Sequence, residues 1–245
     1  VGMDNIDVKY GRDKGLHVIN TPAASSLSVA ELAMGSLFQM ARFTYDAARK
    51  MPSNGVTDFN ALKKAYSKGT ELRGKTLGII GFGGIGQELA KYALGCGMNV
   101  LFHTRNEASV KLTMNIGGNQ IEITLNPSSL DKFLSDSDYI SVHVPKQADG
   151  SAVIGSAELA KMKKGVALVN TSRGGSIDED ALLDALNSGH VKVAALDVFV
   201  GEPAPRADLL AHPNILSTPH IGGSTMEAQD RIGEELADQI IALFK

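Results

Sequence analysis

The sequence predicts an α/β protein built on a doubly wound parallel sheet. One observation behind this prediction is a nearly all-apolar run, Thr76–Ile80, which is too short for a helix and has the pattern of a strand buried on both faces. The other is that similar apolar runs alternate with amphipathic segments from residue 120 to residue 217. Such alternation is typical of parallel strands joined by crossover helices.

A glycine-rich turn follows the first predicted strand. Gly81, Gly83 and Gly86 separate that strand from QELAKYAL, a segment of good helix formers with one apolar face. Glycine is required at such a place for a tight turn, for a backbone that a pyrophosphate can approach, and for close packing of helix on strand. The free N–H groups at the start of the helix would face the anion. We therefore predict a dinucleotide site; the alternative is a glycine-rich turn used only for packing.

The remaining elements are predicted from the same periodicities. Before the glycine turn, a short helix within residues 4–20 closes at Gly15 and leads into a strand at 16–19, and a long helix at 27–50 precedes a connector. After the turn, strands are expected at residues 100–102, 120–124, 139–144, 166–170, 193–198 and 215–217, and helices at 130–135, 156–162, 178–187 and 225–244.

Composition excludes several classes of function. The chain has 245 residues, of which 43% are hydrophobic, enough to fill a sizeable core. A net charge of -3 with no run of like charges provides no footprint for nucleic acid or an anionic membrane. No apolar run approaches the roughly 20 residues of a membrane span, and no metal site is predicted. The single cysteine, Cys96, excludes a disulfide framework and favours a reducing, cytoplasmic setting.

Three successive predicted strands are each followed by a loop with a reactive side chain, namely Arg173, Glu202 and His220. Because ligands of open α/β sheets bind beyond the carboxyl ends of the strands, we expect these side chains to share the edge on which the dinucleotide lies. Each of them alone is most often a solvated surface group. Their joint placement is what predicts a site.

The three residue types suit hydride transfer between a nicotinamide ring and a 2-keto acid. A histidine such as His220 can deliver a proton to the carbonyl oxygen and recover it near neutral pH. The carboxylate of Glu202, bonded to the other ring nitrogen, would hold the tautomer and favour the imidazolium. The guanidinium of Arg173 can bind a substrate carboxylate by two parallel bonds while it polarises the adjacent carbonyl.

Six segments in this order resemble those of the D-isomer-specific 2-hydroxyacid dehydrogenase family: GMDNID, NTP followed by SVAEL, GKTLGIIGFGGIG, VNTSRGGSIDE, AALDVFVGEP and TPHIGGSTMEAQ. The last is most similar to the D-3-phosphoglycerate dehydrogenase branch, which serves serine biosynthesis. The resemblance implies a Rossmann domain with NAD as cofactor, a small 2-hydroxy or 2-keto acid as substrate, substrate binding by Arg173, support of the histidine by Glu202, and acid/base catalysis by His220.

The resemblance also implies a wider set of contacts. The cofactor contacts that it implies are Gly84, Ile85, Val144, Thr171, Ser172, Asp197, Gly222 and Gly223. The long helix at 27–50 resembles the family's dimer-forming segment, so we expect a homodimer or a larger homo-oligomer.

One position departs from the family pattern. The acidic residue that usually takes the adenosine ribose hydroxyls after the second Rossmann strand is replaced by Thr104, with Arg105 next to it. Loss of the carboxylate removes repulsion against a 2′-phosphate, and Arg105 could pair with that phosphate. We therefore predict a weakened preference for NAD that allows the use of NADP.

The resemblance divides the chain into three parts. Residues 1–19 resemble the C-terminal remnant of a flavodoxin-like substrate domain, residues 20–222 form the dinucleotide-binding domain, and residues 223–245 form a helix that returns to the substrate domain. Most of the family's N-terminal substrate domain is missing before Val1. We therefore expect this chain to bind cofactor but to turn over poorly.

Two alternative functions stay open. A glyoxylate or hydroxypyruvate reductase would run the same chemistry on a smaller substrate. A non-enzymatic NAD(H)-sensing protein similar to the family's corepressors would keep the same catalytic residues. The phosphoglycerate-dehydrogenase-like ending and the absence of a disordered tail favour the enzyme.

Overall fold

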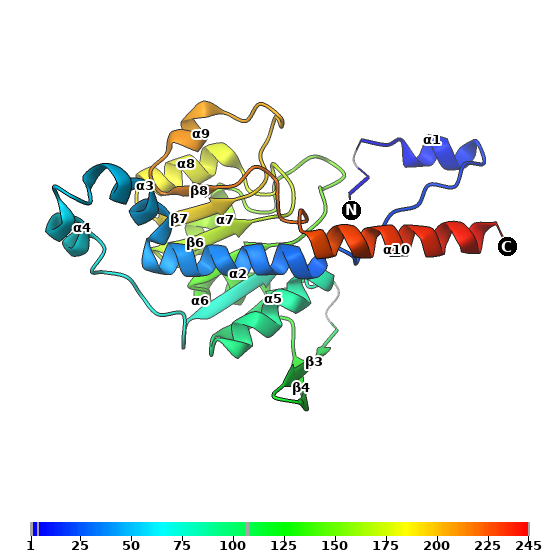
Figure 1. Ribbon diagram of the computed structural model, residues 1–245, viewed down its shortest axis with the longest axis horizontal. Coiled ribbons are helices and arrows are strands. Elements are labelled where there is room, and N and C mark those ends of the chain that lie inside the picture. Colours follow the sequence, from blue (N-terminus) through cyan, green and yellow to red (C-terminus); the bar gives the residue numbers. More distant parts are fainter. Residues whose placement is uncertain (1, 4, 106–107, 245) are drawn as a thin grey trace.

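The computed structural model describes residues 2–3, 5–105 and 108–244. Its centre is a six-stranded parallel sheet in the order β2-β1-β5-β6-β7-β8 (Figure 1). The strands are β1 (Thr76–Ile80), β2 (Asn99–His103), β5 (Tyr139–Val142), β6 (Val166–Asn170), β7 (Val191–Leu196) and β8 (Ile215–Ser217). The doubly wound parallel sheet predicted from the sequence is confirmed.

Helices cover both faces of this sheet. One face is covered by α2 (Ser26–Arg42) and α5 (Gly84–Gly95), whose apolar side chains share one core cluster with the sheet. The other face is covered by α6 (Leu130–Asp136), α7 (Ser156–Lys161), α8 (Glu179–Asn187) and the five-residue α9 (Ala207–Ala211). Strands buried on both faces explain why the strand sequences are continuous apolar runs rather than alternating ones.

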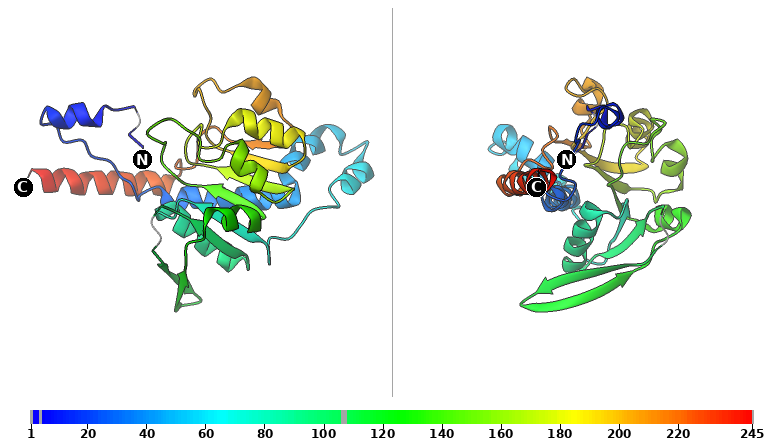
Figure 2. Two further views of the ribbon diagram at one scale, coloured as in Figure 1. Left: turned by 180° about the vertical axis from the view of Figure 1, so that it is seen from behind. Right: turned by 90° about the vertical axis from the view of Figure 1, so that its right-hand side faces the viewer.

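The helices near the two ends of the chain lie outside the layers around the sheet. Helix α1 (Val8–Asp13) lies above the C-terminal helix α10 (Met226–Leu243), and both extend beyond the sheet (Figures 1 and 2). The predicted helix closure at Gly15 is confirmed, since Gly15 has a left-handed φ of 78° and its N–H bonds to Arg12 O. The predicted strand at 16–19 is wrong, because no strand among the described residues lies beside it to complete a ladder.

The long helix predicted at residues 27–50 is two helices. The first, α2, ends at Arg42, and α3 (Thr44–Asn54) starts after Phe43, whose φ of 54° is left-handed. The break falls at the start of Phe43, Thr44 and Tyr45, which are aromatic and β-branched residues with weak helix propensity. Lys192 lies 4.8 Å from the Phe43 ring centroid, so a contact distant in sequence stabilises the turn. The connector after α3 contains α4 (Phe59–Ala65).

A β-hairpin replaces the single strand predicted at residues 120–124. Strands β3 (Val110–Ile116) and β4 (Asn119–Leu125) pair with each other, apart from the parallel sheet, and extend away from it (Figure 2). The two-residue turn at Gly117 and Gly118 has positive φ at both positions, and Leu112 anchors the hairpin in the core. The sequence contains a hairpin signal that we did not use, namely two adjacent glycines between two segments in which apolar and polar residues alternate.

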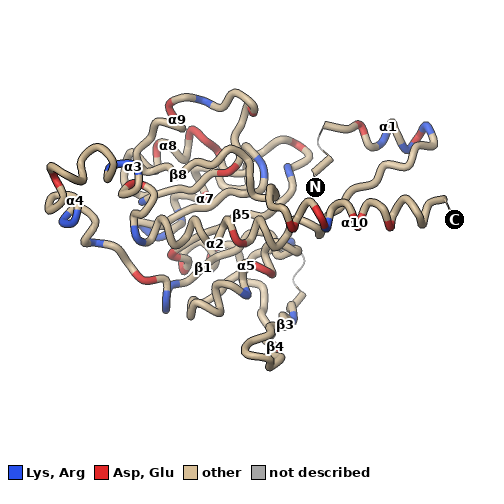
Figure 3. The backbone as a smooth tube through the Cα atoms, viewed as in Figure 1, with Lys and Arg blue, Asp and Glu red and all other residues tan. Residues whose placement is uncertain are grey.

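Lys and Arg are interspersed with Asp and Glu along the chain (Figure 3). None of the helices in the described part of the chain is long and apolar enough to cross a membrane.

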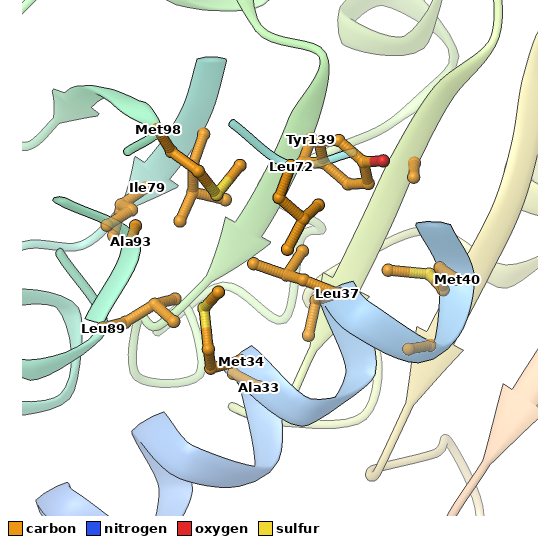
Figure 4. Close-up of a cluster of buried hydrophobic side chains, with 14 of the residues drawn as sticks. Ala33, Met34, Leu37, Met40, Leu72, Ile79, Leu89, Ala93, Met98 and Tyr139 are labelled. Carbon is orange, nitrogen blue, oxygen red and sulfur yellow. The ribbon is translucent and has the colours of Figure 1, made fainter. Parts of the chain in front are cut away.

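The core between α2, α5 and the sheet is closely packed. Leu37 from α2, Leu89 from α5 and Ile79 of β1 belong to one hydrophobic cluster, and all three side chains are fully buried (Figure 4). On the opposite face of β1, Gly78 leaves room for the ring of Phe133 and the hydroxyl of Ser137. This glycine therefore allows the helix layer to approach the sheet.

We expect Gly78→Ala to destabilise the fold by at least about 1–3 kcal/mol, because its Cβ would stand 2.8 Å from the Phe133 ring. Chemical denaturation followed by circular dichroism measures the free energy of unfolding. The matched control is Gly35→Ala in α2, where nothing lies within 4 Å of the added Cβ. That variant should be about 0.5–1 kcal/mol more stable than the wild type. Equal stability of the two variants would contradict the packing argument.

Candidate active site

The glycine turn after β1 has the geometry of a phosphate-binding turn. Gly81 has a left-handed φ of 87°, and a Cβ there would collide with the carbonyl oxygen of His143. Gly86 lies against β1, where a Cβ would stand 3.1 Å from Ile79 Cγ2. Gly83 is open, with nothing within 4 Å of a Cβ. Gly81 thus makes the tight turn, Gly86 allows close packing of helix on strand, and Gly83 leaves the backbone open to a ligand.

A cleft with a volume of about 830 Å³ lies over the carboxyl ends of β5, β6 and β7. Most of the predicted site residues line it: Ile85, Val144, Thr171, Ser172, Arg173, Asp197, His220, Gly222 and Gly223. The predicted residues outside its lining are Gly81, Gly83, Gly84 and Gly86 of the turn and α5, Thr104 and Arg105, which follow β2, and Glu202. The structure thus gathers residues from four strand ends around one cleft.

The residues of this cleft fit a dinucleotide. Ile85 in the first turn of α5 lines the cleft, and the N-terminus of this helix with the open Gly83 before it offers backbone N–H groups to an anion. Thr171 Oγ1, on a residue that lines the cleft, is buried without a hydrogen-bond partner among the described residues. A buried hydroxyl without a hydrogen-bond partner destabilises a protein by about 1–3 kcal/mol. A ligand that forms a hydrogen bond with this hydroxyl would therefore bind more tightly.

The His220 imidazole and the Glu202 carboxylate form a hydrogen-bonded pair. Nδ1 of the ring and Oε2 of the carboxylate are 2.7 Å apart. The other carboxylate oxygen accepts from the backbone N–H of Phe199 at 2.8 Å. Desolvation acts to raise the pKa of Glu202, but the hydrogen bonds from His220 and Phe199 outweigh it and hold that pKa below its ordinary value. Glu202 is therefore an anion at neutral pH and orients the ring.

The loop that carries His220 is held by Asp197, which is 2% exposed. Asp197 Oδ1 accepts from Thr218 Oγ1 at 2.6 Å and from the Ile221 N–H at 2.9 Å, and Oδ2 accepts from the Gly222 N–H at 2.8 Å. The sequence predicts Asp197 as a cofactor contact. The structure adds that both carboxylate oxygens position the residues on either side of His220, which itself has a left-handed φ of 54°.

The turn that carries Arg173 is held by Asn170, a residue that our sequence analysis did not single out. Asn170 Oδ1 accepts from Ser172 N and Ser172 Oγ, and its Nδ2 donates to Arg173 O at 2.9 Å. The guanidinium is directed by a bond from Nη1 to Ser172 O at 2.7 Å. A polar side chain at the end of the apolar strand VALVN was the available signal.

A second cleft of about 810 Å³ adjoins the first. Arg173 and His220 line both clefts, whereas Glu202 lines only the second of the two, together with Asn5 and Lys146. The three predicted catalytic side chains therefore meet at the boundary between the two clefts. This arrangement allows a cofactor in one cleft and a small acid in the other to share the same histidine and arginine.

His143 is a further cleft residue that our sequence analysis did not assign to the site. Its Nε2 lies 2.8 Å from Ser141 Oγ, and its Nδ1 is buried without a partner among the described residues. Burial lowers the pKa of His143 to about 3, so the ring is neutral at physiological pH. Its neighbour Val144 was the predicted contact, and sequence gave no sign of the burial of His143.

Comparison with known proteins is consistent with this geometry. Residues 34–222 match the family described as D-isomer specific 2-hydroxyacid dehydrogenase, NAD binding domain. The chain is 44% identical to a hydroxypyruvate reductase of Thermotoga maritima, over 98% of this chain and 74% of that protein. It is 40% identical to a D-3-phosphoglycerate dehydrogenase of Methanocaldococcus jannaschii, over 98% of this chain and 43% of that protein. The chain thus spans less than half the length of that relative.

A solved structure of a relative has a similar fold. The crystal structure of a glyoxylate reductase from Paecilomyes thermophila matches with a TM-score of 0.77 at 35% identity, covering 96% of this chain and 67% of that chain. The fold and the site define a nicotinamide-dependent class of α/β protein. The chain belongs to the D-isomer-specific 2-hydroxyacid dehydrogenase family, and the matched region is its NAD-binding domain.

We expect the depressed pKa of His143 to make the fold acid-sensitive. The unfolded chain binds a proton at this residue near pH 6.5, whereas the folded protein does so only near pH 3. Between pH 7 and pH 5 this difference should lower the free energy of unfolding by about 2 kcal/mol. Urea unfolding at both pH values measures this change. In His143→Gln the free energy of unfolding should fall by about 2 kcal/mol less between pH 7 and pH 5 than in the wild type. The control His17→Gln removes an exposed histidine, and an equal flattening in that variant would contradict the assignment.

Proposed function

We propose that this chain carries the cofactor-binding part and the catalytic residues of an NAD(P)-dependent 2-hydroxyacid dehydrogenase that acts on 3-phosphoglycerate. The observation that supports this most directly is the His220–Glu202 pair, which meets Arg173 at the boundary of the two clefts. A bound nicotinamide cofactor supplies the hydride for reduction of a 2-keto acid and accepts it in the reverse direction. The residues of the chain then have to bind the acid and move one proton.

The proton transfer falls to His220. Since Nδ1 is bonded to Glu202, Nε2 is the atom left to exchange a proton with the substrate oxygen. The anionic Glu202 holds this tautomer and stabilises the charged ring when the proton is present. Asp197 and the turn around it keep the histidine loop in place during the exchange.

Substrate binding falls to Arg173. Its guanidinium is forked and always charged, so it can hold a carboxylate by two bonds and polarise the neighbouring carbonyl. The bond from Nη1 to Ser172 O and the Asn170 bonds around the turn restrict where the group can point. Fixed donors of this kind require no reorganisation when charge develops on the substrate oxygen.

The choice of 3-phosphoglycerate is supported by the sequence TPHIGGSTMEAQ and by the phosphoglycerate dehydrogenases among the relatives. On this proposal the protein serves serine biosynthesis, in the reducing, cytoplasmic setting that a single cysteine favours. Reduction of hydroxypyruvate or glyoxylate is the second candidate, supported by the Thermotoga maritima relative and by the glyoxylate reductase structure.

The proposal extends to the organisation of the chain. Residues 1–19 and 223–245 would belong to the substrate domain, and residues 20–222 to the dinucleotide-binding domain. Support comes from the position of α1 and α10 outside the sheet layers and from the bond of Gln239 Nε2 to Asn20 O (Figure 2). A homodimer would form through α2 and α3, the two helices found at residues 27–50, where Phe38 is 47% exposed.

We expect His220→Gln to lower kcat by about 10²–10⁴-fold, because no other group would deliver the proton. The Kd for NADH, measured by calorimetry, should stay within about twofold of the wild type. Turnover is measured on the full-length gene product with 3-phosphohydroxypyruvate, hydroxypyruvate, glyoxylate and pyruvate, using NADH and NADPH. The control His212→Gln changes a histidine outside both clefts and should keep wild-type turnover.

Three outcomes would contradict parts of this proposal. Retained activity in His220→Gln would move proton transfer to another group. NADH binding without turnover of any keto acid by the full-length product would favour the NAD-sensing alternative. Fast turnover by residues 1–245 alone would refute the expectation that this chain binds cofactor but turns over poorly.

We expect the binding site to accept NADP, with Kd values for NAD and NADP that differ by less than about tenfold. Thr104→Asp should shift that ratio toward NAD by tenfold or more, because a carboxylate would accept the ribose hydroxyls and repel a 2′-phosphate. Calorimetric titration of both cofactors measures the ratio. The control Thr124→Asp adds the same charge to the exposed hairpin and should leave the ratio alone. A strong preference for NAD in the wild type would show that Thr104 and Arg105 do not discriminate.

A further inference from the structure

The cleft on the substrate side of His220 has an excess of positive charge. Two of its described lining residues are cations, Arg173 and Lys146. Its one described carboxylate is Glu202, and both oxygens of that group are engaged, one with His220 Nδ1 and the other with the Phe199 N–H. Most of the other described lining is glycine backbone and apolar side chain. Lys146 is thus a cation of this cleft in addition to the arginine that the proposed mechanism uses.

Lys146 is the cation that the proposed mechanism does not use. It lies on the loop between β5 and α7, two residues after Val144, which lines the cofactor cleft. Its ammonium makes no hydrogen bond or ion pair with any described residue. The nearby Asp149 is occupied, since its Oδ1 accepts from both the N–H and the hydroxyl of Ser151. The charge of Lys146 is therefore available to a ligand in the cleft.

An unpaired exposed lysine is most often a solvated surface group. What distinguishes Lys146 is that it lines the same 810 Å³ cleft as Arg173 and His220. An ammonium on a flexible four-carbon stem is a point charge with three donors, which suits a phosphate or carboxylate whose position varies. A guanidinium held by its turn suits the planar carboxylate next to the reacting carbon.

We propose that Lys146 is a specificity-determining residue that binds a second anionic group at the far end of the substrate. This inference rests on the proposed function, in which Arg173 takes the first carboxylate. The class of substrate is then a 2-keto or 2-hydroxy acid with two anionic groups. The second group is a phosphate ester or a second carboxylate, and the choice of substrates in the test separates these two sources.

The test uses Lys146→Met and Lys146→Arg in the full-length gene product with NADH. Steady-state KM values are measured for 3-phosphohydroxypyruvate, for 2-oxoglutarate and for the singly charged hydroxypyruvate. In Lys146→Met the KM of the preferred dianion should rise about tenfold relative to that of hydroxypyruvate, because one ion pair in a partly shielded cleft is lost. Lys146→Arg should keep most of the preference. The control Lys68→Met removes an exposed lysine distant from both clefts and should leave the KM ratio alone.

The preference should also weaken as salt concentration rises in the wild type, and less so in Lys146→Met. A KM ratio that Lys146→Met leaves unchanged would overturn the inference while leaving the proposed function in place. Failure of the wild type to turn over any of the three acids would count against the proposed function instead. In that case titration of 3-phosphoglycerate and D-glycerate into the NADH complex decides the role of Lys146. Equal loss of affinity for both acids in Lys146→Met would overturn it.

Discussion

The parallel register of β5, β6, β7 and β8 is the constraint on which the site depends. In that register Val142 lies opposite Asn170, Asn170 opposite Leu196, and Leu196 opposite Ser217, so the strands end together at one edge. Every loop that leaves this edge starts within reach of its neighbours. An arginine, a glutamate and a histidine that are distant in sequence lie close together there, because each belongs to a loop that leaves the end of a neighbouring strand.

Two buried polar side chains hold the loops at this edge in defined positions. Asn170 is the last residue of β6 and Asp197 directly follows β7, and each is 2% exposed. The Asn170 side chain makes hydrogen bonds to the turn after its own strand and so holds Arg173. The Asp197 side chain makes hydrogen bonds to the loop after the neighbouring strand β8 and so holds His220. A buried carboxylate or amide is stable only when its hydrogen bonds are made. Stability of the fold and orientation of the predicted catalytic side chains therefore depend on the same hydrogen bonds.

Sequence reasoning succeeded where one local pattern excludes other structures. The strand Thr76–Ile80 and the strand Val166–Asn170 have the predicted boundaries, since short apolar runs next to glycines fit only buried strands. It failed at Phe43, where a helical pattern continues through a break that tertiary contacts stabilise. It failed again at residues 16–19, where an apolar run has no neighbouring strand, because a strand exists only when its backbone groups are paired.

The sequence by itself determined the alternating α/β fold, the glycine turn and the identity of the three catalytic candidates. These follow from periodicity, from the conformations open to glycine, and from the reactivity of each side chain, all of which are local properties. Tertiary structure alone decided that Asp197 braces the histidine loop, that the His143 ring is neutral with its Nδ1 buried, and that Lys146 shares a cleft with Arg173. Burial and proximity arise from packing between segments that are distant along the chain, and no local pattern encodes them.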